Sequence, residues 1–138
     1  MKSYTSLEQS KKLAEILPIE SADMRYGYIA PYDFSDRMYD GGYDEVPYPK
    51  DFLIKNPNFS ADEYDAELPC WSLSALLDLI PDIIEDYVLR IDKVDGEYFI
   101  WYDKIGEGWS DAIDHPSSEN FIDAAFEMIC WLKENGKI

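Results

Sequence analysis

The feature that most constrains the fold is a pair of alternating runs, Tyr87–Val94 and Glu97–Lys104, separated by Asp95-Gly96. Both runs are rich in β-branched and aromatic residues, and an Asp-Gly pair between two such runs is a strong signal for a two-residue hairpin turn. The turn also fixes the register, because a shift of one residue would exchange the two faces of each strand. The sequence therefore predicts an antiparallel β-hairpin over residues 87–104.

The predicted register gives the hairpin two different faces. The expected core face carries the cross-strand pairs Leu89–Tyr102, Ile91–Ile100 and Lys93–Tyr98, and the opposite face pairs Arg90 with Trp101 and Asp92 with Phe99. Arg90, Phe99 and Trp101 form a candidate binding patch, since aromatic side chains beside an arginine are typical anchors of protein interfaces. The alternative is that the long tyrosine-rich segment, residues 31–69, covers this face.

Helical periodicity predicts three helices, over residues 5–17, 71–80 and 118–134. Thr5 and Glu8 have the spacing of a capping box at the start of the first, and Ser72 is the expected N-cap of the second. Short strands are expected at Met24–Ala30 and at about 108–113. The predicted fold class is α+β, with about three helices packed on a small antiparallel sheet built around the 87–104 hairpin.

A length of 138 residues fits a single domain, 1–138. The predicted core consists of Leu13, Leu17, Leu76, Leu77, Leu89, Ile91, Ile100, Phe121, Ala125, Ile129 and Leu132. Apolar residues cover most of the circumference of the last helix, which predicts that more than one of its sides is covered. If one flank pairs with a second copy of the chain, Met128 and Trp131 are the residues expected at that interface.

Residues 31–69 carry no regular periodicity and are rich in aromatic and acidic side chains. Disordered segments are poor in aromatic residues, so we expect a long irregular connection that is pinned by its tyrosines onto the sheet. Tyr39 and Tyr43 of this region are candidate binding residues. Its acids do not have the spacing of an EF-hand calcium loop.

Charge and composition limit the classes of ligand. With 29 acidic against 12 basic residues, the net charge of −17 repels phosphate, so neither nucleic acid nor an anionic membrane is an expected partner. The chain has one histidine, His115, and two cysteines, Cys70 and Cys130, too few for a usual zinc site. We therefore expect no metal and no cofactor. We expect a cytoplasmic location, because the N-terminal residues lack the apolar run of a signal peptide.

Four segments resemble a group of short proteins from gut anaerobic bacteria. The segments are LEQSKKLAEILPIESADM, PCWSLSALLDLIP, GEYFIWYD and DAAFEMICWLKENGKI. That group occurs among mobile-element and prophage-like proteins of unknown function. The resemblance implies an accessory genetic context and supplies no catalytic residues.

Three hypotheses for the function follow from the sequence. The first is a non-enzymatic cytoplasmic protein that binds a protein partner or a second copy of itself. The second is an acidic mimic of DNA that inhibits a nucleic-acid-binding protein. The alternative explanation of the acidic residues is that they simply keep the protein soluble. The third is a small enzyme with a carboxylate acid or base, in a cleft where Tyr39, Tyr43 or Tyr48 meets Arg90 and Trp101.

Overall fold

The fold is taken from a computed structural model, which describes residues 2–29, 32–34, 37–39, 42–43, 46–49, 66–104, 108–113 and 116–138. The chain forms two compact units. The N-terminal unit is Ser6–Trp71, and the C-terminal unit combines Met1–Thr5 with Ser72–Ile138. Each unit has its own helix and sheet, so the two are treated separately below. The assignment of residues 1–138 to a single domain stays a prediction.

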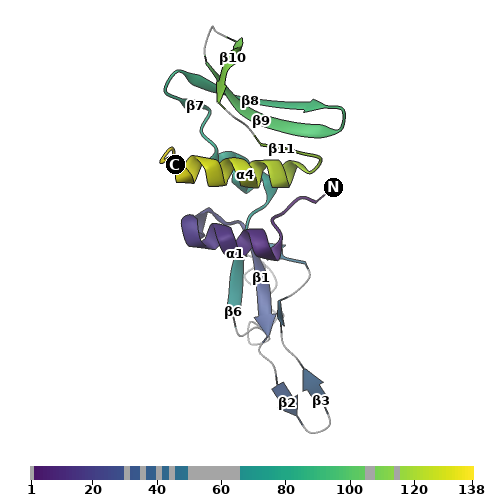
Figure 1. The fold of residues 1–138 in the computed structure, drawn as a ribbon. Coiled ribbons are helices and arrows are strands. Elements are labelled where there is room, and N and C mark those ends of the chain that lie inside the picture. The colour runs from purple at the N-terminus through teal and green to yellow at the C-terminus, as the bar shows by residue number, and fades with distance from the viewer. Residues whose placement is uncertain are drawn as a thin grey trace. The chain divides into compact units, whose positions relative to one another are not determined.

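The N-terminal unit is a helix on a small antiparallel sheet (Figure 1). Its elements are α1 (Leu7–Ile16), a 3-10 turn η1 (Ile19–Ser21), β1 (Met24–Ile29), β2 (Tyr32–Phe34), β3 (Arg37–Tyr39), β4 (Gly42–Tyr43), β5 (Tyr48–Pro49) and β6 (Ala66–Cys70). Strand β1 pairs with β6, β4 and β5, while β2 and β3 pair with each other. The described parts of residues 31–69 therefore contain short strands, where the sequence suggested an irregular connection.

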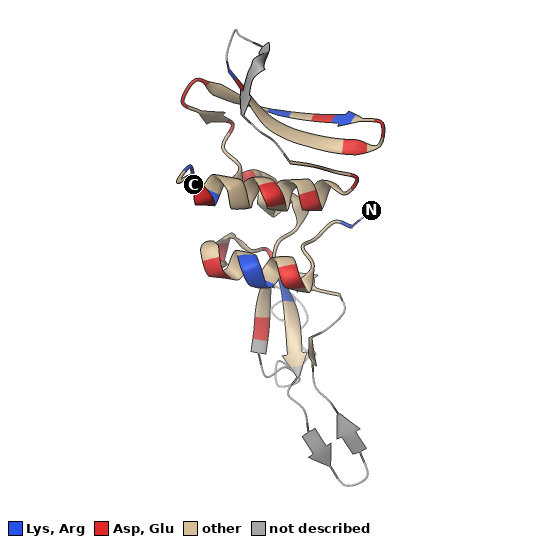
Figure 2. Ribbon diagram, in the orientation of Figure 1, with Lys and Arg blue, Asp and Glu red and all other residues tan. Residues whose placement is uncertain are grey.

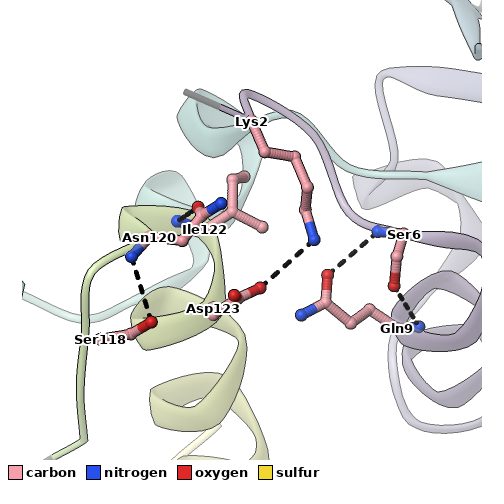
Figure 3. A network of polar contacts seen from close by, with 7 residues as sticks. All are labelled: Lys2, Ser6, Gln9, Ser118, Asn120, Ile122 and Asp123. Carbon is pink, nitrogen blue, oxygen red and sulfur yellow. Dashed lines mark hydrogen bonds and ion pairs between the residues drawn. The ribbon is translucent and has the colours of Figure 1, made fainter.

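The capping box of α1 lies one residue later than the sequence spacing suggested. The Ser6 side chain accepts a hydrogen bond from the Gln9 backbone N–H at 3.1 Å, and Gln9 Oε1 accepts from the Ser6 N–H at 3.0 Å (Figure 3). The expected cap residue, Thr5, is instead fully buried. A serine and a threonine at adjacent positions both allow a capping box, and the structure forms the one at Ser6.

The C-terminal unit is built on the predicted hairpin. Its elements are α3 (Leu73–Leu79), β7 (Ile83–Ile84), β8 (Tyr87–Val94), β9 (Glu97–Lys104), β10 (Gly108–Ile113), β11 (Ser117–Ser118) and α4 (Phe121–Glu134). The strand order is β10-β9-β8-β7, with β11 also paired to β9. Asp95 and Gly96 both have positive φ, +51° and +81°, as a type I′ turn requires.

The predicted register is confirmed pair by pair. Leu89 lies opposite Tyr102, Ile91 opposite Ile100 and Lys93 opposite Tyr98, and Arg90 and Asp92 lie opposite Trp101 and Phe99. The strand over 108–113 and the Ser72 cap of α3 are confirmed as well. The class is α+β with three α-helices in the described residues, as predicted. The structure adds a second sheet, which gathers strands from the N-terminal unit.

The first residues of the chain belong to the C-terminal unit. The Leu73 N–H donates to the Ser3 carbonyl at 3.0 Å, and Lys2 Nζ lies 3.3 Å from Asp123 Oδ1 on the first turn of α4. Asn120 caps the same helix by accepting from the Ile122 N–H at 3.0 Å (Figure 3). Asp123 lies at the end of α4 where the helix dipole is positive, which favours its carboxylate.

Helix α4 packs on β9, β11 and α3, and its contacts define the core of this unit. Most of the predicted core is buried, including Leu13, Leu17, Leu76, Ile100, Ala125, Ile129 and Leu132. Leu77, Leu89 and Phe121 are half-buried. Ile91 is 45% exposed, so its assignment to the core was wrong. The core-facing side of the hairpin was predicted correctly. On that side the β9 residues Ile100 and Tyr102 are buried, because α4 packs against β9, whereas Ile91 on β8 is not.

The pair Ile91 and Ile100 gives a matched test of this packing. Ile100 is fully buried and Ile91 is not, although the two face each other across the hairpin. We expect Ile100→Ala to lower the free energy of unfolding by about 2–5 kcal/mol, because it leaves a cavity. Ile91→Ala should cost less than about 1 kcal/mol. Chemical denaturation measures both, and equal losses would contradict the packing described here.

Candidate functional site

The predicted patch on the outer face of the hairpin is only partly exposed. Trp101 is 6% exposed and therefore lies in the interior, while Phe99 is half-buried. Arg90 is exposed, and its Nε lies 4.0 Å from Asp103 Oδ2. The three residues share the predicted face, and burial of Trp101 leaves Arg90 as the accessible member. That residues 31–69 cover this face stays a prediction.

The two tyrosines proposed as binding residues belong to the other unit. Tyr43 is half-buried in β4, with its ring 4.9 Å from that of Tyr28 and 5.3 Å from Lys11 Nζ. The side chain of Tyr39 lies outside the described residues. Tyr48 donates a hydrogen bond to Glu67, across the strands that flank β1. These contacts place the described tyrosines in the N-terminal sheet.

The residues proposed for a dimer interface on α4 have different environments. Met128 is fully buried, so it offers no surface to a second copy, whereas Trp131 is half-buried. The physical reason is that α4 is covered by β9 and β11 and also by α3. The apolar residues of α4 therefore pack within the C-terminal unit. The sequence had suggested that one side of this helix could instead pack against a second copy of the chain.

A different apolar surface appears at the edge of the hairpin sheet. Ile83, Ile91 and Val94 are 58%, 45% and 50% exposed, and they are the exposed large hydrophobic residues of the described C-terminal unit. We call these three residues the β7–β8 edge surface; they share an edge and not a face, because Ile91 points to one side of the sheet and Ile83 and Val94 to the other. Sequence reasoning missed it because the alternating pattern assigned Ile91 to the core. The pattern gave no sign that the first part of β8 is half-buried and the second part is exposed.

The same edge carries outward-pointing backbone groups that pair with no strand among the described residues. Strand β7 pairs only with Val88 and Tyr87, and the Leu89 N–H then donates to the Asp82 carbonyl at 2.9 Å. Beyond that bond, no strand in the described part of the chain lies beside Arg90–Val94 on the side away from β9. Figure 1 shows that β7 runs beside only the start of β8, whereas the hairpin extends well past it.

The closed end of this edge is held by a buried tyrosine. The Tyr102 hydroxyl donates to the Pro81 carbonyl at 2.6 Å, and its ring is fully buried. Burial, together with the nearby negative charge of Asp82, raises the pKa of Tyr102 to about 12. This bond ties β9 to the segment that leads into β7, and so fixes where β7 ends and the unpaired edge begins.

The described residues offer few groups for other chemistry. No three His, Cys, Asp or Glu side chains among them could together hold a metal ion. Cys70 is buried and Cys130 half-buried, both as free thiols. His115 lies outside the described residues. No helix that the structure describes is long and apolar enough to cross a membrane.

Comparison with protein-family models, with curated proteins and with solved structures finds no match for this chain. The functional argument therefore depends on the geometry of the described surfaces.

The Tyr102 anchor predicts a specific loss of stability in alkali. A pKa raised in the folded state means that the stabilisation is complete below pH 10 and is lost as the pH rises from 10 toward 12. Over that window Tyr102 should contribute a slope of at most about 1.4 kcal/mol per pH unit. Tyr102→Phe should remove this contribution while costing about 1–3 kcal/mol at neutral pH, because the Pro81 carbonyl loses its donor.

The measurement is the free energy of unfolding of both proteins at a series of pH values from 8 to 12. Subtracting the two curves cancels the titration of the other tyrosines and lysines. A difference that stays constant between pH 10 and 12 would contradict the burial of the Tyr102 hydroxyl.

Proposed function

We propose that the chain is a non-enzymatic protein-binding protein and that it binds its partner through the β7–β8 edge surface. The observation that carries this proposal is that the exposed Ile91 and Val94 lie on a length of β8 whose outer side pairs with no described strand. Exposed apolar residues scattered singly are normal on protein surfaces. Exposed apolar residues on an edge that can also form backbone hydrogen bonds are the combination expected of an interaction site.

The edge is protected against indiscriminate pairing, which supports a selective partner. Charged residues alternate along β8, as the blue and red segments in Figure 2 show. The Asp92 side chain also accepts a hydrogen bond from the Lys93 backbone N–H at 2.8 Å, and so occupies one donor of the edge. Natural proteins use such charges to prevent aggregation at open edges. A partner must therefore match these charges.

The DNA-mimic hypothesis receives less support. Several carboxylates of the described part are ion-paired within their own unit, such as Asp123 with Lys2, Glu85 with Lys137 and Asp103 with Arg90. An array that imitates phosphates needs unpaired carboxylates in regular rows. The enzyme hypothesis placed its site beneath residues 31–69, and it stays a prediction because most of that region lies outside the described residues.

The accessory genetic context and the cytoplasmic location belong to the proposal as well. The accessory genetic context rests on the resemblance to proteins of mobile elements. The acidic composition supports the solubility that a freely diffusing binding protein needs.

Site-specific photo-crosslinking tests the proposed surface. A benzophenone amino acid at position 91 should give a covalent adduct with a protein partner in cells that produce this chain, because Ile91 is 45% exposed and lies within the proposed binding edge of β8. The same probe at position 19 is the matched control, since Ile19 is 54% exposed but lies in the N-terminal unit. Adding Val94→Asp, on the same outer edge of β8, should reduce the adduct at position 91 at least fivefold.

Mass spectrometry of the adducts reads the result. No adduct at position 91, or the same adducts at positions 91 and 19, would contradict the proposal.

A further inference from the structure

The free edge of β8 is chemically defined by the residues whose backbone points outward. In an antiparallel ladder, the N–H and C=O of one residue point to the same side, and successive residues alternate. The Leu89 N–H points away from β9, because it donates to Asp82. The backbone groups of Ile91 and Lys93 therefore point to the same outer side, while Arg90 and Asp92 exchange hydrogen bonds with Trp101 and Phe99 of β9.

We infer that the outer edge of β8, over Arg90–Val94, accepts an extended segment of another protein as an additional antiparallel strand. This inference rests on the proposed function and adds the mode of binding and the chemistry of the partner. Strand addition to an open edge is a common way of binding peptides, in which main-chain hydrogen bonds provide affinity and side-chain matching provides specificity.

A second copy of this chain fits the edge poorly. If two β8 strands pair about Ile91, Arg90 of each lies opposite Asp92 of the other, which is favourable. The same register sends Lys93 of the second copy opposite Leu89, where Asp82 already lies. A register that avoids Asp82 is centred on Lys93, and it sets the lysines of the two copies opposite each other. The intermediate register is centred on Asp92, and it sets the two aspartates opposite each other.

A foreign segment has no such symmetry and can match each position. Opposite Ile91 it needs an apolar, β-branched residue, which would cover part of the exposed isoleucine. Opposite Asp92 it needs a basic residue, and opposite Arg90 an acidic one. It must end there, since Asp82 closes the next position. The Asp92 carboxylate would leave the Lys93 N–H and pair with the basic residue instead.

The partner chemistry is thus a short extended segment that reads basic, apolar, acidic in the N-to-C direction. This order is independent of the protein's net charge. A segment that bound only because the chain carries −17 would prefer any basic sequence, whatever the order of its residues.

Two peptides of identical composition test the inference. The matched peptide is Lys-Val-Thr-Arg-Val-Glu, and the exchanged peptide is Lys-Val-Thr-Glu-Val-Arg, both with blocked ends. NMR titration of the full, isotope-labelled chain measures their dissociation constants. The matched peptide should bind roughly fivefold or more tightly, because two cross-strand ion pairs replace two like-charge contacts. Its shift changes should centre on the Ile91 and Lys93 amides.

A charge-exchanged protein supplies the control. The variant Arg90→Asp with Asp92→Arg keeps the net charge and should prefer the exchanged peptide by a similar factor. If loss of the Arg90–Asp103 ion pair unfolds it, Asp92→Asn keeps that pair and should lower the preference of the protein for the matched peptide. Methylating the backbone nitrogen of the valine opposite Ile91 should weaken binding at least fivefold, since that N–H is expected to donate to the Ile91 carbonyl.

Equal affinity for the two peptides, or shift changes centred away from β8, would overturn strand addition. In that case a photo-adduct at position 91 would still support the proposed function, with binding through side chains alone. An adduct between two copies of the chain would also overturn the inferred partner, since it would show that self-pairing overcomes the clash with Asp82.

Discussion

The left-handed turn at Asp95-Gly96 is the constraint on which the described C-terminal unit depends. Its two positive φ angles fix the pairing of β8 with β9, and the pairing decides the direction of every backbone group and side chain of the hairpin. Ile100 and Tyr102 consequently face the core, where α4 packs. The same register turns the backbone of Ile91 to the outer edge. The register set by this turn thus determines both which residues of the hairpin form the core and which backbone groups form the candidate binding edge.

The sequence predicts well what local interactions decide. The turn residues gave the register, Ser72 gave the start of α3, and apolar spacing gave three helices. The N-terminal sheet could not be predicted in this way, because β1 pairs with β6 about 40 residues away. Such long-range pairing depends on the tertiary packing around the strands, and short strands such as β4 and β5 leave little periodicity to detect.

The candidate sites were harder to predict than the fold, because they depend on which side of an element is covered. Periodicity identified the faces of the hairpin but not that Trp101 would be buried and Ile91 exposed. It also identified α4 as apolar all round, but not that β9, β11 and α3 would use that surface and bury Met128. Neither outcome follows from the spacing of residues within one element.

Amide hydrogen exchange in β8 of the free protein tests the central claim most directly, namely that the outer edge of this strand is unpaired. The Arg90 and Asp92 amides are bonded to β9, whereas the Ile91 amide points to solvent. Exchange of Ile91 should therefore be faster than that of its two neighbours by at least about tenfold, since those amides require opening of the hairpin. Equal protection of the three amides would contradict the account, because it would show that another strand already covers this edge.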